Sequence, residues 1–84
     1  MFAFVILHYL AEEMTKECVE YLEKYLDMNR CKIIIVDNAS SNGSGQRLKN
    51  YYSNKDYCDV LLNNENAGFA RGNNVGFKYA KRKI

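Results

Sequence analysis

The chain has 84 residues, with twelve Lys and Arg against ten Asp and Glu and a formal net charge of +2. This length allows one small domain, and a charge so close to neutral does not by itself indicate nucleic-acid binding. The hydrophobic fraction of 48% excludes a disordered chain. No apolar run approaches the roughly 18 residues of a membrane span, and no basic segment of signal-peptide type opens the chain. We therefore expect a cytoplasmic protein without a membrane span.

Three short apolar runs, at residues 2–7, 32–37 and 59–63, are expected to be strands. Runs that are apolar on both faces are typical of parallel strands covered by helices. The stretch between the first two runs is amphipathic and predicts a helix. Its expected apolar side consists of Met14, Cys18, Leu22, Tyr25 and Leu26.

Two further helices are expected after the second and third strands. Ser44 is the expected cap of a helix over residues 44–54, whose apolar positions are Leu48, Tyr51 and Tyr52. A last helix is expected from about residue 68 to the basic end of the chain. The alternating order predicts a three-layer, Rossmann-like α/β domain over residues 1–84, with a parallel three-stranded sheet.

The three cysteines are widely spaced and form no C-x-x-C pair, so neither a zinc site nor a thioredoxin-type motif is predicted. We expect buried or half-buried thiols in a reducing compartment. The single histidine, His8, has no Cys or carboxylate at ligand spacing. It is expected to pack at a strand end or to lie beside a ligand. No metal-ligating or catalytic residue is assigned.

Ligands of parallel α/β sheets bind at the carboxyl ends of the strands. Here these ends are His8-Tyr9, residues 37–44 and residues 63–74. Asp37 and the polar residues after it can accept hydrogen bonds from the imide or ribose hydroxyl groups of a ligand. A turn capped by the Asp37 side chain explains the same residue equally well.

The third of these segments contains a glycine repeat. Gly68, Gly72 and Gly76 recur every four residues, so a helix here can closely approach a sheet or a ligand. A helix that begins at Gly68 offers free N–H groups to a phosphate. Arg71 faces the positive end of the helix dipole, which indicates either a function or an ordinary solvated side chain. Lys and Arg are common at helix C-termini because they complement the helix dipole, so the basic end of this helix does not indicate a nucleic-acid partner.

Two segments resemble family 2 glycosyltransferases. Residues 33–44, IIIVDNASSNGS, are similar to the second strand and following loop of that family. Residues 64–76, NENAGFARGNNVG, resemble its N-x-G-F-A-x-G-N-N-x-G segment at the expected distance. Residues 5–9 fit the first strand, although many members have Tyr-Asn where this chain has Tyr9-Leu10. The resemblance covers nearly the whole chain.

The resemblance implies a GT-A fold and transfer of a hexosyl or rhamnosyl group from a UDP- or dTDP-linked sugar to an acceptor hydroxyl, with inversion. Cell-wall or polysaccharide biosynthesis is the implied setting. Asp37 would bind the base through its imide N–H, with His8 and Tyr9 nearby. The implied nucleotide-sugar-binding residues are His8, Tyr9, Asp37, Asn38, Asn66, Gly68, Arg71 and Asn74.

In the family, a following strand carries an Asp-x-Asp-like motif for Mg²⁺ or Mn²⁺, and a catalytic base lies further on. This chain contains no Asp-x-Asp. We therefore expect the amino-terminal donor-binding part of a longer enzyme, not competent for transfer alone. The alternative is a non-enzymatic α/β binding or assembly module. The first strand, central in the family fold, would be an exposed edge here, which predicts self-association through it.

Overall fold

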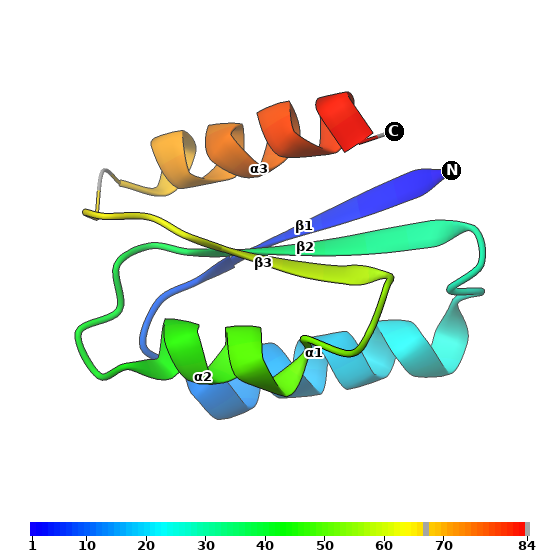
Figure 1. The fold of residues 1–84 in the computed structure, drawn as a ribbon, viewed down its shortest axis with the longest axis horizontal. Helices are drawn as coiled ribbons and strands as arrows, with labels where there is room; N and C mark the ends of the chain where they lie inside the picture. The colour runs from blue at the N-terminus through cyan, green and yellow to red at the C-terminus, as the bar shows by residue number, and fades with distance from the viewer. Residues whose placement is uncertain (67, 84) are drawn as a thin grey trace.

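Strands and helices alternate along the chain, as expected (Figure 1). The computed structural model describes residues 1–66 and 68–83. The observed bounds of each strand agree with the predicted ones to within one residue at both ends. No helix among the described residues is long and apolar enough to cross a membrane. The elements are β1 (Phe2–His8), α1 (Glu12–Tyr25), β2 (Cys31–Asp37), α2 (Ser44–Tyr51), β3 (Cys58–Leu62) and α3 (Phe69–Lys83).

The sheet is parallel throughout, in the order β1-β2-β3. β2 is central, and β1 is an edge strand, as predicted. In the strand register His8 pairs with Asp37, and Asp37 pairs with Leu62. The carboxyl ends of all three strands therefore lie side by side, and the loops that follow them share one edge of the sheet.

The core is built on β2, whose Ile33, Ile34, Ile35 and Val36 are fully buried. Helices α1 and α2 cover one face of the sheet and α3 covers the other (Figure 1). Ile33 and Ile35 belong to the core cluster under α1 and α2, while the alternate side chains point toward α3. Burial on both faces explains why this run is continuously apolar.

The glycine repeat of α3 packs directly on the sheet. A Cβ on Gly72 would lie 2.5 Å from Leu7 Cδ1, and a Cβ on Gly76 would lie 2.4 Å from Val5 Cγ1. Both glycines are buried, and they are the buried residues of this helix. The expected close approach to the sheet is confirmed for Gly72 and Gly76. It is wrong for Gly68, which precedes the helix with φ of 91° and has open space where a Cβ would lie.

The predicted apolar side of α1 is only partly right: Leu22 and Leu26 are half-buried, and Leu22 packs against the core, but the other three residues do not. Thr15 and Val19 are the buried residues of this helix. The helix is turned by about one residue because the Thr15 hydroxyl lies 2.6 Å from a ring nitrogen of buried His8. Three of the side chains that were expected to face inward are instead exposed, namely Met14, Cys18 and Tyr25.

The prediction for α2 is also corrected at both ends. Gly43, with φ of 75°, is the N-cap, and Ser44 is the first helical residue. The Ser44 side chain is used elsewhere, as described below, so it does not cap the helix. The helix ends at Tyr51 rather than near residue 54, and Tyr51 is 55% exposed. Leu48 and Tyr52 are buried as expected.

All three cysteines are free thiols. Cys31 and Cys58 are buried, as expected, whereas Cys18 is exposed on the outward side of α1. Burial raises the pKa of the Cys58 thiol to about 12, so this thiol stays protonated and unreactive at neutral pH.

Candidate functional site at the carboxyl edge of the sheet

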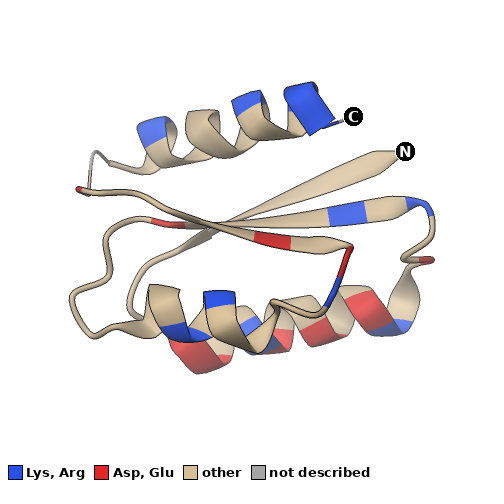
Figure 2. Ribbon diagram, in the orientation of Figure 1, with Lys and Arg blue, Asp and Glu red and all other residues tan. Residues whose placement is uncertain are grey.

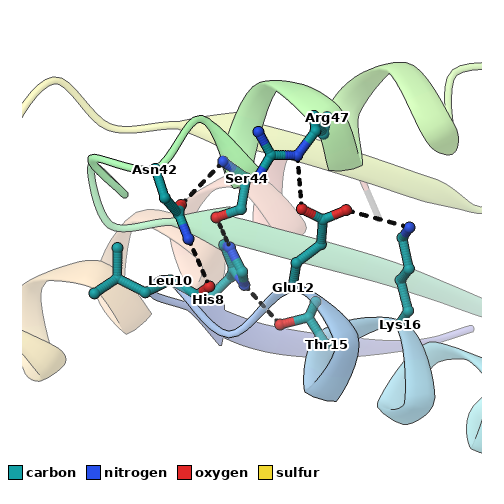
Figure 3. Close-up of polar contacts among 8 residues, drawn as sticks. All are labelled: His8, Leu10, Glu12, Thr15, Lys16, Asn42, Ser44 and Arg47. Atoms are coloured by element: carbon teal, nitrogen blue, oxygen red, sulfur yellow. Dashed lines mark hydrogen bonds and ion pairs between the residues drawn. The ribbon is translucent and has the colours of Figure 1, made fainter.

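A buried histidine joins the first turns of two helices at this edge (Figure 3). His8, the last residue of β1, is 1% exposed. Its Nδ1 lies 2.6 Å from Thr15 Oγ1 on α1, and its Nε2 lies 2.7 Å from Ser44 Oγ on α2. Both ring nitrogens are thereby occupied by side chains of the protein.

The loops after β1 and β2 are tied together through the backbone of Leu10. Its N–H donates to Ser40 Oγ at 2.9 Å, and its carbonyl accepts from Asn42 Nδ2 at 2.9 Å. Leu10 and Ala39 both have left-handed backbones, with φ of 62° and 61°. Residues other than glycine are uncommon in this conformation and occur preferentially at functional sites.

Asp37 closes β2 and is 5% exposed. Its Oδ1 accepts from the Ser40 N–H at 3.3 Å, which is the capped turn considered from the sequence. Its Oδ2 lies against the first turn of α2, because a Cβ on Gly45 would come within 2.0 Å of it. The carboxylate therefore occupies the space that a side chain at position 45 would fill.

The loop after β3 is joined to this group by a pair of asparagines. Asn38 Nδ2 donates to Asn66 Oδ1 at 2.8 Å, and the same oxygen accepts from the Gly68 N–H at 3.0 Å. The Asn38 N–H donates to the His8 carbonyl at 2.9 Å. Asn38 is 4% exposed, and its Oδ1 has no hydrogen-bond partner among the described residues. Five predicted site residues thus lie together: His8, Asp37, Asn38, Asn66 and Gly68.

The other three predicted residues lie further out. Tyr9 is 46% exposed beside His8, and Arg71 and Asn74 are exposed on α3. Asn74 lies midway between the buried Gly72 and Gly76, so it is on the side of α3 away from the sheet. Arg71 lines a concavity of about 490 Å³ together with Asn63, Asn64, Glu65 and Val75.

A charged group flanks the buried histidine on its outer side (Figure 3). Glu12 of α1 accepts from Arg47 Nε on α2 at 2.7 Å and pairs with Lys16 at 3.3 Å. The hydrogen bond from Arg47 lowers the pKa of Glu12. Burial lowers the pKa of His8 despite the charges of Asp37 and Glu12, which act in the opposite direction. The imidazole is therefore neutral at pH 7, and one of its nitrogens is a hydrogen-bond acceptor.

A larger concavity, of about 720 Å³, lies at the opposite edge of the sheet, around Lys32 and Lys55. Lys32 pairs with Asp59 at 3.2 Å and Lys55 pairs with Glu23 at 3.1 Å. These two lysines are already neutralised, and the strand-end loops are remote from them. We therefore place the candidate site at the carboxyl edge, as the sequence predicted.

The residues present do not form a metal site. Among residues 1–66 and 68–83, no three His, Cys, Asp or Glu side chains gather in a way that could hold a metal ion. The divalent cation implied by the resemblance is assigned no ligand in this part of the chain, and no chemical step is derived through it.

Sequence reasoning missed the residues that support the site. The sequence predicts Ser44 only as a helix cap, and no pattern in it indicates a role for Thr15 or Gly45. Their contacts join positions up to 36 residues apart, so no local pattern reveals them. One signal for these contacts is present in the sequence. A single histidine ends the first strand, and a hydroxyl residue lies in the first turn of each of the two helices that follow.

This architecture, a parallel β-α-β-α-β-α sheet with polar loops at its carboxyl edge, defines a Rossmann-like α/β domain. The family model described as "Glycosyl transferase family 2" matches residues 3–84, and the chain belongs to that family. Its fold is a truncated form of the GT-A fold. Comparisons with curated proteins and with solved structures give no match.

Proposed function

We propose that this chain binds the nucleoside diphosphate of an activated sugar, as the donor-binding part of a glycosyltransferase. One observation carries the proposal. Asp37 stands at the carboxyl end of the central strand, 5% exposed, with its carboxylate fixed between Ser40 and Gly45. A carboxylate accepts the imide N–H of uracil or thymine, so UDP- and dTDP-linked sugars are the proposed donors.

The proposed diphosphate position is next to the start of α3. The loop before it is pinned by Asn66, and Arg71 is exposed in the first turn. The N–H groups of a helix start and a guanidinium group both suit anionic oxygens. The arrangement supports binding of a donor, whereas the described residues contain neither a metal cluster nor an assigned general base. Transfer itself is therefore not assigned to these residues, and neither is an acceptor.

Cytoplasmic action is part of the proposal. Two buried thiols and one exposed thiol are all free, which fits a reducing compartment. A role in cell-wall or polysaccharide synthesis rests on the family alone, and the divalent cation of the family would require ligands beyond those described.

Calorimetric titration with UDP and dTDP, with and without Mn²⁺, tests the proposal. We expect binding that Mn²⁺ does not change. In Asp37→Asn, which keeps the shape but loses the charge, affinity should fall by about tenfold or more, because hydrogen bonds to charged groups contribute about 1.5–3 kcal/mol. The matched control is Asp56→Asn, an exposed acid at the opposite edge. Equal affinity in Asp37→Asn and the wild type would contradict the assignment of Asp37. No binding of either nucleotide to the wild type would contradict donor binding by these residues and would leave the family assignment standing.

We also propose that two copies of the chain associate through β1. This strand is an edge of the sheet, and its first side chain, Phe2, is 70% exposed. An apolar edge strand with unpaired backbone groups favours pairing with another strand. The proposed partner is β1 of a second copy of the chain, because it presents the same apolar edge.

A further inference from the structure

His8 does not have the position of a residue that contacts a ligand. The ring is 1% exposed, and both nitrogens are engaged, with Thr15 Oγ1 at 2.6 Å and Ser44 Oγ at 2.7 Å. The chain folds back over the ring on both sides, from α1 and from α2 (Figure 3). A base bound at the edge of the sheet would meet Tyr9 and Asp37 before it met this imidazole.

The Ser44–His8 pair has the spacing of a nucleophile and its base, but it is not a hydrolytic site. Ser44 is fully buried, with 0% exposure, so no substrate carbon can reach its oxygen. Nucleophilic catalysis requires an accessible hydroxyl beside the base. The two hydrogen bonds of His8 are therefore structural, and their effect on the site depends on which backbone segments they hold in place.

What the Ser44 bond holds in place is the first turn of α2. Ser44 is immediately followed by Gly45, whose Cα has the Asp37 carboxylate packed against it, because a Cβ there would lie 2.0 Å from Oδ2. The Ser44 N–H is also fixed, by Asn42 Oδ1 at 3.1 Å. A shift of this turn moves the surface against which the carboxylate rests.

The protonation state of His8 matters for this contact. The groups that face the ring are Thr15 and Glu12 from α1, Ser44 from α2 and Asp37 from β2. A neutral ring can accept a hydrogen bond from one hydroxyl and donate to the other, whereas an imidazolium makes both hydroxyls acceptors. It also places a buried positive charge near the Asp37 carboxylate, where it competes with a donor N–H of a ligand.

We propose that His8 is a positioning residue, which fixes the Asp37 carboxylate through the Ser44 hydroxyl and the first turn of α2 and so sets the affinity for the nucleotide without touching it. The proposal rests on the proposed function, since it concerns the affinity of the same site. It differs from the family expectation for His8 in assigning the effect to a chain of internal contacts.

Nucleotide affinity should consequently depend on pH. Burial lowers the pKa of His8 from its ordinary value of 6.5, so the folded chain keeps a neutral ring at pH 7. As the pH falls below 6.5, the unfolded chain takes up the proton first, so the stability that the neutral ring contributes is lost on acidification. Affinity for UDP should decline at lower pH, as the pH falls through the lowered pKa of the ring in the folded chain.

The test compares UDP affinity of the wild type with that of Ser44→Ala, Ser53→Ala and His8→Gln, at about pH 7.5 and at a series of lower pH values below the ordinary imidazole pKa of about 6.5. Ser44→Ala should bind UDP about tenfold more weakly, the factor that one ordinary hydrogen bond is worth. The matched control is Ser53→Ala, which removes an exposed hydroxyl just after α2 that donates to the Asn50 carbonyl, and it should stay within about twofold of the wild type. His8→Gln keeps a donor and an acceptor, so it should retain affinity at the higher pH and lose the pH dependence. Thermal unfolding of each variant verifies that it is folded.

A second readout needs no ligand. In the wild type, the NMR shift of the Gly45 amide should follow the titration of the His8 ring, and in Ser44→Ala it should not. Equal affinity in Ser44→Ala and Ser53→Ala, or a Gly45 amide shift that does not follow the titration of His8 in the wild type, overturns the proposal while Asp37 and the proposed function stand. A wild type that binds no UDP overturns the proposed function and this proposal with it.

Discussion

Leu10 stands in a backbone conformation that favours asparagine or glycine. Its φ of 62° is left-handed, and both its N–H and its carbonyl are held by the β2 loop. This conformation costs an L-residue about 1–2 kcal/mol, and it costs Asn less because the short polar side chain of Asn can form hydrogen bonds with the nearby backbone.

Leu10→Asn is therefore expected to raise the free energy of unfolding, by less than the ~1–2 kcal/mol of strain that it relieves, because the partly exposed Leu10 side chain also gives up apolar contact. The matched control is Leu62→Asn, because Leu62 is also 38% exposed but lies in an extended strand. The control should lose stability, since it gives up apolar contact without relieving strain. Urea unfolding of both variants measures the difference. A Leu10→Asn variant less stable than the wild type would contradict this account.

At the scale of residues, the sequence predicts which positions are polar but not how they connect. Asp37 and Asn38 are identified because polar residues follow a run of β-branched ones directly. The left-handed backbones of Leu10 and Ala39 cannot be predicted in this way, because neither residue type favours that conformation. The space filled by the Asp37 carboxylate appears only when Gly45 is placed beside it.

At the scale of elements, the strands follow from sequence because their apolar runs are long and β-branched, whereas the orientation of α1 does not. Its periodicity counts Met14 and Cys18 as apolar, and the fold instead turns Thr15 inward to meet His8. The polar contact between Thr15 and His8, at the end of β1, thus determines which side of α1 faces the sheet. The apolar pattern of the helix alone leaves this side ambiguous. The close packing of α3 at Gly72 and Gly76 can be predicted from the sequence, because residues four apart lie on one face of any helix.

The close packing of α3 predicts the effect of Gly76→Ala. The added Cβ would lie 2.4 Å from Val5 Cγ1 and 3.0 Å from Val36 Cγ2, and both valines are stiff side chains anchored in strands. We expect a loss of about 1–3 kcal/mol from overpacking, which outweighs the gain of about 1 kcal/mol in helix propensity. Lys78→Ala, at an exposed position of the same helix, is the control and should change stability little. Denaturant unfolding that ranks Gly76→Ala at or above the control would show that the contact is looser than described.

At the scale of the whole molecule, charge is separated between the two faces of the sheet (Figure 2). α3 carries five basic and no acidic residues, while α1 carries five acidic and two basic ones. The sequence already shows this division, since residues 1–42 have a net charge of −3 and residues 43–84 have +5. The fold turns a difference along the chain into a difference across the sheet, because α1 and α3 cover opposite faces.

The proposed association through β1 is also a property of the whole molecule. Phe2→Glu places a charge on the exposed edge and should shift the sedimentation coefficient from that of a dimer to that of a monomer at high micromolar concentration. Tyr21→Glu introduces the same charge at a similarly exposed aromatic residue on α1, at 65% against 70%, and should leave the dimer intact. A wild type that sediments as a monomer at this concentration would rule out the association.

The glycine contact of α3 has a consequence for how the site comes apart. The two glycines bring the backbone of α3 onto Val5, Leu7 and Val36, so detachment of this helix would expose apolar side chains of both strands beneath it. The start of α3 should therefore open only together with the apolar face that the helix covers, and not as a loosely attached segment. A nucleotide that contacts both the end of β2 and the start of α3 would join two elements that this packing already holds together.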